Sequence, residues 1–582
     1  MEKEQVMEQV KDMEQEQVKG HELEKEQEQE EEMNEMVEEE IEEEMTDIED
    51  VIEDEDSKVS SESSDSSERD GETEETDETA GWRSRSGICW SPTPAETLPY
   101  IPVPTGLTPG PTHHALSRIS TVKSTFDLFL TDDIMKLILN MTNLQGRRSK
   151  KDWKDIDITD LQAFIGLLIL SGVYRSHKES LHSLWDDQTG RPIFRATMAL
   201  RRFNLIESVI TFDDKLTRSR RKHDMLAAVR VLWEKWTDRL PMLFNPGRNV
   251  CVDKQLVAFR GNCRFRQYMP KKHARYGIKI WVTCDVGTCY AWRMQVYTGK
   301  EDGQPSEGGQ EKQVVLDMLE GLRGHTVTCD KFFTSFSLSE ELLLKRKIAL
   351  VGTIRSNKLE LPKNLLQIRH RAVFSSLFGF TKTHSLVSYI PRRGKNLLLL
   401  SSKHRAPKVN KRKPVIITDY NSCKRAVENL EKVLGTYSCN RRTRRWPMVM
   451  FFNIIDISAF NAFVLWTVAE PSWNQTKTCK RRLFLEELGK SLVTPQMARR
   501  QVLPRAPVAS AVVEALQHRQ EEPVDEQAPV EPGEKKRKQC DFCKAHKRKR
   551  VYNTCYRCEK QICKEHSAMI CLSCSTLTHS HP

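Results

Sequence analysis

The sequence predicts an α/β core with an attached helical region, placed between an acidic N-terminal tail and a small cysteine-rich C-terminal module. Three observations support this organisation: the length of 582 residues, the separation of charge along the chain, and the clustering of cysteine. The length allows roughly three or four domains. Seven of the 16 cysteines lie between Cys540 and Cys574. Because the N-terminus lacks the basic and apolar pattern of a signal peptide, this clustering favours metal binding over disulfides.

Charge divides the chain into two parts. Residues 1–80 contain 36 Asp and Glu but only 6 Lys and Arg, a net charge of −30. The remaining residues contain 84 basic and 46 acidic side chains, a net charge of +38. A body this basic indicates a polyanionic partner, and nucleic acid is the usual one. The acidic tail, residues 1–80, is expected to be disordered because its charge density opposes a packed core.

The segments that follow are interpreted from their composition and periodicity. Residues 81–121 are rich in Pro, Gly and Ser and predict a linker. Residues 122–248 show repeated helical patterns, with Thr131 and Asp132 as N-cap candidates before an apolar helix face. About 438–500 is expected to complete this helical region. A second linker is predicted at 501–534.

One segment, residues 451–470, has the length of a membrane span (FFNIIDISAFNAFVLWTVAE). It contains Asn453, Asp456 and Asn461, each of which is costly in lipid. We therefore expect a buried core helix and no membrane association.

From residue 249 the pattern changes to strands. Three β-type runs are followed by a helix, a strand, a second helix and a short strand. This order is typical of a ribonuclease H-like α/β core, here predicted at 249–356 and 415–437 with an insertion at 357–414.

Two carboxylates lie where such a core would carry a metal site. Asp253 is in the first strand, and Asp330 ends a later one. Acidic side chains that converge at a sheet edge can hold two divalent ions, which activate a nucleophile and stabilise the leaving oxygen. Mg²⁺ prefers such oxygen ligands. The competing interpretation is that each aspartate is a cap or an ion-pair partner.

Several longer motifs resemble those of piggyBac-type transposases, in the transposable-element-derived group of animal genomes. They are VDKQLVAFRGNCRFRQYMPKKHARYGIKIWVTCDVGT, TCDKFFTS, VGTIRSNK, YNSCKRAVENLEK and SCNRRTRRWPM. The resemblance spans about residues 122–470. It implies a metal-dependent cut-and-paste DNA transposase that uses three aspartates, acts at TTAA sites and needs two Mg²⁺ ions. Asp253 and Asp330 match the first two catalytic positions.

The third catalytic position departs from the family pattern. The stretch that the family writes as YN-x-T-K-G-G-V-D-x-x-D places Glu428 at the third carboxylate and Glu431 at the supporting acid. Arg425 and Ala426 replace two glycines, and Lys254 stands beside Asp253 where the family usually has an acid. Glutamate is one methylene longer than aspartate, and an active site tolerates about 0.5 Å of displacement. These changes put catalysis in doubt.

Two basic runs are candidates for DNA contact. The insertion carries Lys403, Arg405, Lys408, Lys411, Arg412 and Lys413. Phosphate contact is the natural use of such a run, and an exposed loop is the alternative. A second run, Arg441, Arg442, Arg444 and Arg445, precedes Trp446. It is compatible with DNA contact or with a salt-bridged helix start.

The C-terminal module, residues 535–582, has the spacing of a zinc-binding domain. Four two-residue-spaced pairs supply eight ligands, enough for two tetrahedral structural Zn²⁺ sites: Cys540, Cys543, Cys555, Cys558, Cys563, His566, Cys571 and Cys574. In a cross-brace, the first pair shares an ion with the third and the second pair with the fourth. Sequential pairing remains the alternative. Adjacent basic runs, 535–538 and 547–550, indicate nuclear localisation.

We therefore expect a transposase-derived, nuclear, double-stranded-DNA-binding protein that recognises transposon ends. The family implies that the helical region contributes to DNA binding and dimerisation, so a homodimer is expected. Two alternatives stay open. The chain is a catalytically inactive chromatin or DNA-binding protein, or its zinc module serves protein interaction in the manner of RING and PHD modules.

Overall fold

The structure is a computed structural model that describes residues 81–270, 272, 274–299, 309–521, 538–539, 550–551 and 564. The acidic tail and all eight predicted zinc ligands lie outside the described residues. The chain divides into two compact units, Met1–Val513 and Glu514–Pro582. In the second unit, β16 (Lys538–Gln539) pairs antiparallel with β17 (Arg550–Val551). The first unit carries the core and the candidate site.

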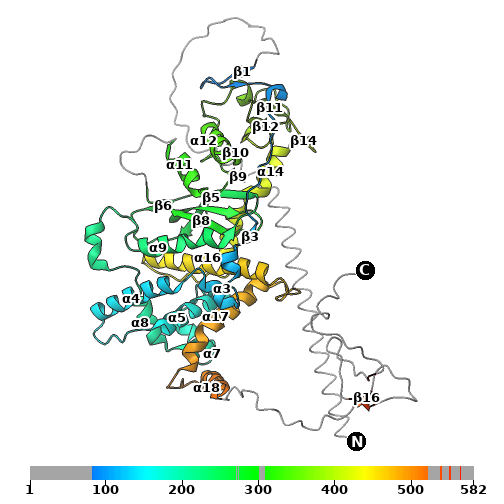
Figure 1. The fold of residues 1–582 in the computed structure, drawn as a ribbon. Coiled ribbons are helices and arrows are strands. Elements are labelled where there is room, and N and C mark those ends of the chain that lie inside the picture. Colours follow the sequence, from blue (N-terminus) through cyan, green and yellow to red (C-terminus); the bar gives the residue numbers. More distant parts are fainter. Residues whose placement is uncertain are drawn as a thin grey trace, which may run out of the picture. The chain divides into compact units, whose positions relative to one another are not determined.

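A nine-stranded mixed sheet forms the centre of the first unit (Figure 1). Its order is β11-β12-β13-β10-β9-β5-β7-β6, with β8 also paired to β7. β9 runs parallel to both β5 and β10, and the other pairings are antiparallel. The strands are β5 (Asn249–Ala258), β6 (Arg266–Tyr268), β7 (Tyr276–Asp285), β8 (Ala291–Val296), β9 (Thr326–Cys329), β10 (Ala349–Thr353), β11 (Ser376–Phe380), β12 (Ser385–Tyr389) and β13 (Leu397–Ser401). The predicted α/β core is confirmed at this level.

Helices alternate with the later strands of the sheet, as the sequence pattern predicts. The α-helices along this part of the chain are α11 (Gly309–Met318), α12 (Phe336–Glu341), α13 (Lys363–Leu366), α14 (Val415–Lys424) and α15 (Ala426–Thr436). A single π-helical turn, η3 (Leu342–Arg346), extends α12. α14 contacts β5, β9, β10 and β13, so it lies across the middle of the sheet.

The helical region before the sheet consists of short and medium helices. They are α3 (Val122–Asp127), α4 (Asp132–Ser149), α5 (Ile158–Val173), α6 (Leu181–Leu184), α7 (Pro192–Thr197), α8 (Leu200–Val209), the 3-10 segment η2 (Lys215–Arg221), α9 (Arg230–Thr237) and α10 (Arg239–Leu243). α4 begins after Thr131, as the sequence predicts. α5 begins at a capping box, in which Asp157 and Asp160 satisfy each other's backbone N–H groups.

A later helix, α17 (Lys480–Ala498), returns to pack against α5. The two helices approach closely because each has a glycine at the crossing. A Cβ on Gly166 would lie 3.0 Å from the Gly489 carbonyl oxygen, and a Cβ on Gly489 would lie 2.6 Å from Leu170. The α-helix that follows, α18 (Pro507–Glu521), lies within the stretch predicted as a second linker, residues 501–534, and therefore differs from that expectation.

The apolar segment predicted as a core helix is α16 (Trp446–Ala469), and 89% of its most apolar window is buried. It lies between the sheet and helices α3, α5 and α17 (Figure 1). Its polar side chains are paired. The Asn453 and Gln255 side-chain amides are 3.1 Å apart, and Asn461 bonds both backbone groups of Ala291 at 3.0 Å. These amides therefore tie the helix to β5 and β8.

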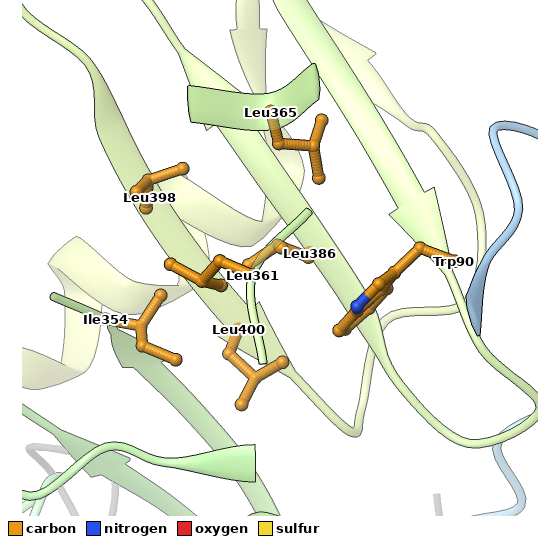
Figure 2. Packing of buried hydrophobic residues seen from close by; sticks show 7 residues of the cluster. All are labelled: Trp90, Ile354, Leu361, Leu365, Leu386, Leu398 and Leu400. Carbon is orange, nitrogen blue, oxygen red and sulfur yellow. The ribbon is translucent and has the colours of Figure 1, made fainter. Parts of the chain in front are cut away.

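The stretch predicted as a linker, residues 81–121, differs from that expectation. β1 (Trp82–Arg83) pairs with β2 (Cys89–Trp90), and the short 3-10 turn η1 (Pro94–Glu96) follows. Trp90 is fully buried (0% exposed) in a cluster with Ile354, Leu361, Leu365, Leu386, Leu398 and Leu400 (Figure 2). Its indole nitrogen donates to the Glu360 carbonyl at 2.9 Å. Burial of this large apolar ring outweighs the turn-forming composition around it.

The rest of residues 81–121 is also part of the folded unit. β3 (Gly110–Pro111) pairs with β4 (Phe244–Asn245), and α2 (His113–Leu116) leads into the helical region. Residues 81–121 therefore connect the insertion at one end to the helical region at the other.

The insertion, 357–414, is ordered and belongs to the sheet. β13 pairs with β10, β12 with β13 and β11 with β12, so three inserted strands continue the central sheet beyond β10. A hairpin of two short strands, β14 (Val409–Asn410) and β15 (Lys413–Pro414), ends the insertion. The alternative interpretation of the insertion as an exposed loop does not hold for its strands.

Candidate functional site

Asp253 and Asp330 are brought together by the sheet register. β5 and β9 are parallel neighbours in which Val252 pairs with Cys329. Each aspartate is the next residue, so the two carboxylates occupy adjacent positions at the carboxyl end of β9. Parallel strands present such residues at one sheet edge.

Burial and a neighbouring carboxylate alter the protonation of Asp253. Burial raises the pKa of Asp253 to about 6, and the negative charge of Asp330 adds to the rise. The nearby cations Lys254 and Lys272 partly oppose it. Asp253 Oδ1 also accepts the backbone N–H of Lys254 at 2.8 Å. A raised carboxyl pKa beside a second carboxylate is the pattern expected of two acids that share one site.

Lys254 places a positive charge beside Asp253 and Asp330. Its Nζ lies 2.9 Å from Asp330 Oδ2, and both side chains are about a quarter exposed (28% and 24%). Asp330 Oδ1 accepts the backbone N–H of Phe332 at 3.0 Å. Both carboxylate oxygens of Asp330 therefore have a donor from the chain itself.

Glu428 and Glu431 are positioned by α15, and they face different surroundings. The Glu428 side chain is 54% exposed, and its carboxylate lies 3.9 Å from Lys432 Nζ one turn along the helix. Glu431 instead accepts the backbone N–H of Leu256 at 2.7 Å through Oε1 and pairs with Lys272 through Oε2. Glu431 thus fastens α15 to β5, and Glu428 faces solvent.

The backbone at the replaced glycines is ordinary. Arg425 has φ −83° and ψ −2°, and α15 begins directly after it. Ala426 is 4% exposed. Neither the helix start nor its packing therefore requires a left-handed glycine at Arg425.

These side chains do not fit a two-metal centre. Within the described residues, no group of three or more His, Cys, Asp or Glu side chains is arranged to hold a metal ion. Two carboxylates are adjacent, one of them is paired with Lys254, and Glu428 pairs with Lys432. A two-metal centre needs several carboxylates that bridge the ions.

A lysine surrounded by aromatic rings adjoins the pair, and the sequence interpretation missed it. Lys279 Nζ lies 3.8 Å from the Trp281 ring centroid, 4.5 Å from that of Tyr297 and 4.9 Å from that of Phe332. Burial lowers the pKa of Lys279 to about 8, and Lys254 contributes to the decrease. The period-2 spacing of Lys279 and Trp281 on one strand was the available signal.

A cavity of about 270 Å³, lined by both apolar and polar side chains, lies beside Glu431. Its lining includes Lys272, Gln255, Asn453 and Asp456. Burial raises the pKa of Asp456 to about 6, although this carboxylate accepts Cys439 N–H at 2.8 Å and Ser438 O–H at 2.6 Å. The polar groups of this cavity are largely used to join α15 and α16 to β5 and to hold residues 438–439 against α16.

The second predicted basic run separates into structural and exposed arginines. Arg441 is 8% exposed and donates to the carbonyls of Ser176 (3.2 Å) and Glu179 (2.7 Å). Arg445 donates to the carbonyls of Glu207 and Ile210. Arg442 and Arg444 are exposed. Half of this run therefore joins α16 to the helical region, as the helix-start interpretation allows.

The insertion keeps most of its basic side chains on the surface. Residues 357–414 contain 14 Lys and Arg but a single acid, Glu360. Lys403 pairs with Asp419 at 2.6 Å, whereas Lys408, Lys411 and Arg412 are exposed. Lys411 and Arg412 form the tip of the β14–β15 hairpin with positive φ values of 43° and 69°. The hairpin thus projects two cations.

A mixed sheet with two carboxylates on adjacent parallel strands is the arrangement of a ribonuclease H-like transposase core, and the comparisons support this class. A family model described as "Transposase IS4" matches residues 121–463. A cryo-EM structure of a piggyBac transposase synaptic complex with hairpin DNA is similar, with a TM-score of 0.68 and 30% identity, over 80% of this chain and 100% of that one. The chain belongs to the piggyBac-type transposase family.

Two human (Homo sapiens) proteins are also similar. PiggyBac transposable element-derived protein 3 is 23% identical over 379 residues, which cover 60% of this chain and 62% of that protein. The chimeric ERCC6-PGBD3 protein is 23% identical over the same length, which covers 35% of it. The chain therefore spans about three fifths of the first relative and about one third of the second.

Proposed function

We propose that this protein is a transposase-derived DNA-binding protein whose carboxylate site no longer supports metal-dependent strand cleavage. The observation that carries the proposal is the ion pair between Lys254 and Asp330 at 2.9 Å. An ammonium group at this position offsets the negative charge that divalent ions require. The exposure of Glu428 supports the same conclusion, because a third ligand would have to reach the aspartate pair.

Charge and family membership support DNA as the partner. Outside the acidic tail the chain carries a net +38, and the insertion carries 14 basic residues against one acid. Neutralisation of phosphates by such a surface releases counterions and drives binding. The similar piggyBac structure is a synaptic complex with hairpin DNA. We extend that partner to this chain, with transposon ends next to TTAA as the ancestral target, a homodimer as the assembly and the nucleus as the location.

Plasmid excision tests the proposal directly. The full chain, its Asp330→Ala variant and a revertant are compared on plasmids that carry piggyBac-type ends flanked by TTAA. The revertant combines Lys254→Asp, Arg425→Gly, Ala426→Gly and Glu428→Asp. We expect DNA binding by all three proteins and no excision by the natural chain or by Asp330→Ala. Robust excision by the natural chain, lost in Asp330→Ala, would overturn the proposal.

An active transposase is the second candidate, and one observation favours it. Asp253 and Asp330 still occupy adjacent positions on parallel strands, as two catalytic carboxylates would. The same assay separates the two candidates. Excision that survived Asp330→Ala would show that neither candidate assigns the carboxylates correctly.

A further inference from the structure

The β11–β12 ladder of the insertion has an open end at which two loops meet. Ser376 pairs with Tyr389 at the last rung of the ladder. Beyond it, Phe374 N–H donates to the Ile390 carbonyl at 2.7 Å, and Ile390 N–H donates to the Ser375 carbonyl at 3.1 Å. The loop before β11 and the loop after β12, residues 391–394, therefore lie side by side.

Two apolar side chains project from the first loop. Val373 is 42% exposed and Phe374 is 46% exposed, and together we call them the apolar tip. An exposed aromatic ring leaves apolar surface in water, and burial of that surface would have stabilised the fold. A single exposed apolar residue is common on protein surfaces, but Phe374 also has an unusual backbone conformation.

The backbone of Phe374 lies in the left-handed region, with φ +66°. A bulky residue rarely adopts this conformation, and it persists only where the surrounding structure enforces it. Arg371 provides that enforcement. Its guanidinium donates to the Ser375 carbonyl at 3.1 Å, to the Ser388 carbonyl at 2.9 Å and to Ser388 Oγ at 2.5 Å. The loop is therefore held rigidly with its phenyl ring outward.

Arginines lie on both sides of the apolar tip. Arg369 precedes it in the loop, and Arg392 and Arg393 lie in the adjacent loop; all three are exposed. The single acid of the insertion, Glu360, accepts Phe336 N–H at 3.3 Å and lies elsewhere in the structure. An apolar protein partner would not account for the arginines on both sides. A polyanion with an apolar interior, such as stacked bases between phosphate rows, accounts for both features.

We propose that the apolar tip inserts Phe374 between two base pairs of duplex DNA, with Arg392 and Arg393 on the flanking phosphates. Apolar wedges of this kind partly unstack a base step and bend the duplex, and pyrimidine–purine steps unstack most readily. The proposal rests on the proposed DNA-binding function and adds a named contact to it. The left-handed backbone of Phe374 and the Arg371 hydrogen bonds fix the loop that presents the ring.

The test uses the full chain and a 30-base-pair duplex with 2-aminopurine at a central TA step, at about 50 mM salt to favour binding. Unstacking raises the fluorescence of 2-aminopurine. Phe374→Gly removes the ring and also relieves the left-handed strain, so its melting temperature should not fall. Phe374→Leu keeps an apolar wedge. Leu116→Ala, which truncates an equally exposed residue (46%) on α2, is the matched control.

We expect Phe374→Gly to bind about five- to tenfold more weakly and to lose the fluorescence rise, with an unchanged salt dependence because no charge is removed. Arg392→Ala with Arg393→Ala should instead lower the slope of log K against log salt by about 2. Phe374→Leu and Leu116→Ala should resemble the natural chain. Equal affinity and fluorescence for Phe374→Gly and the natural chain would overturn the wedge. Absence of any binding by the natural chain would instead overturn the proposed function.

Discussion

Lys254 Nζ lies 2.9 Å from Asp330 Oδ2, so the residue next to one aspartate of the candidate site neutralises the other. The two aspartates are 77 residues apart in the chain, and the parallel register of β5 and β9 makes them neighbours. A cation inserted at this point balances the charge that otherwise attracts divalent metal. The site therefore retains its two aspartates, but Lys254 offsets their negative charge.

Removal of this cation should increase metal affinity. We expect Lys254→Ala to bind Mn²⁺, which prefers carboxylate oxygens as Mg²⁺ does, about fivefold more tightly than the natural chain. The affinity should rise because the variant lacks the Lys254 ammonium group, which competes with the metal ion for Asp330. Isothermal titration of the full chain measures the change. Lys432→Ala removes a lysine paired with exposed Glu428 and serves as the control, with no change expected. Equal affinities for all three proteins would contradict the role given to Lys254.

Asp253 should make stability depend on pH. Its pKa is raised to about 6 by burial and by Asp330, above the value of about 4 in an unfolded chain. Between those values the unfolded state loses its proton first, so the stability linked to Asp253 is complete below pH 4 and is lost as pH rises through 6. Asp253→Asn should therefore stabilise the fold by about 1–2 kcal/mol at pH 8, with little effect at pH 4. Denaturation at both pH values measures the difference, and an equal effect at both would contradict the assignment.

The sequence predicted the parts of this structure that depend on local pattern. The placement of α16 as a buried helix followed from its apolar run, and Asn453 and Asn461 proved to be the residues that bond it to the sheet. The order of strands and helices in the α/β core was also predictable from the sequence. What could not be predicted depends on contacts between distant residues. Trp90 donates to the Glu360 carbonyl 270 positions away, and Lys272 pairs with Glu431 across 159 positions. Composition gave no sign of either contact.

Trp90 should be essential to the insertion. Because its ring is fully buried among six apolar neighbours in and beside the insertion, Trp90→Ala should destabilise the chain by about 3–5 kcal/mol. Urea denaturation gives the free energy, and hydrogen exchange of β11–β13 should accelerate with it. Leu98→Ala, at a side chain 58% exposed in the same segment, should change stability by no more than about 0.5 kcal/mol. Unchanged stability of Trp90→Ala would restore the interpretation of this stretch as a linker.

The acidic tail should weaken non-specific DNA binding. Its net charge of −30 competes with phosphates for the basic body of the same chain, at a high effective concentration. Deletion of residues 1–80 should raise affinity for a random duplex at low salt, on the order of tenfold, with a smaller gain at high salt. A full-length variant with Asn and Gln in place of the tail acids separates charge from length and should behave like the deletion. Affinity that is unchanged or lower after deletion would contradict an inhibitory tail.

The full chain should contain two zinc ions. The spacing of four residue pairs between Cys540 and Cys574 predicts eight ligands, and we expect a module this small to need metal for its folding energy. Metal analysis of the purified chain should return two zinc ions, and a chelator should unfold the module without melting the core. A content of one zinc or none would contradict the ligand assignment.

Two double variants then decide how the pairs share these ions. In a cross-brace, Cys540 and Cys563 hold the same ion, so Cys540→Ser with Cys563→Ser should damage one site and retain one zinc. In sequential pairing those cysteines belong to different sites, so the same variant should lose both ions. Cys540→Ser with Cys555→Ser reverses the two outcomes and serves as the internal control. We expect the cross-brace result, one zinc in the first variant and none in the second. The reversed result would establish sequential pairing, because a tetrahedral site deprived of one thiolate binds too weakly to survive purification.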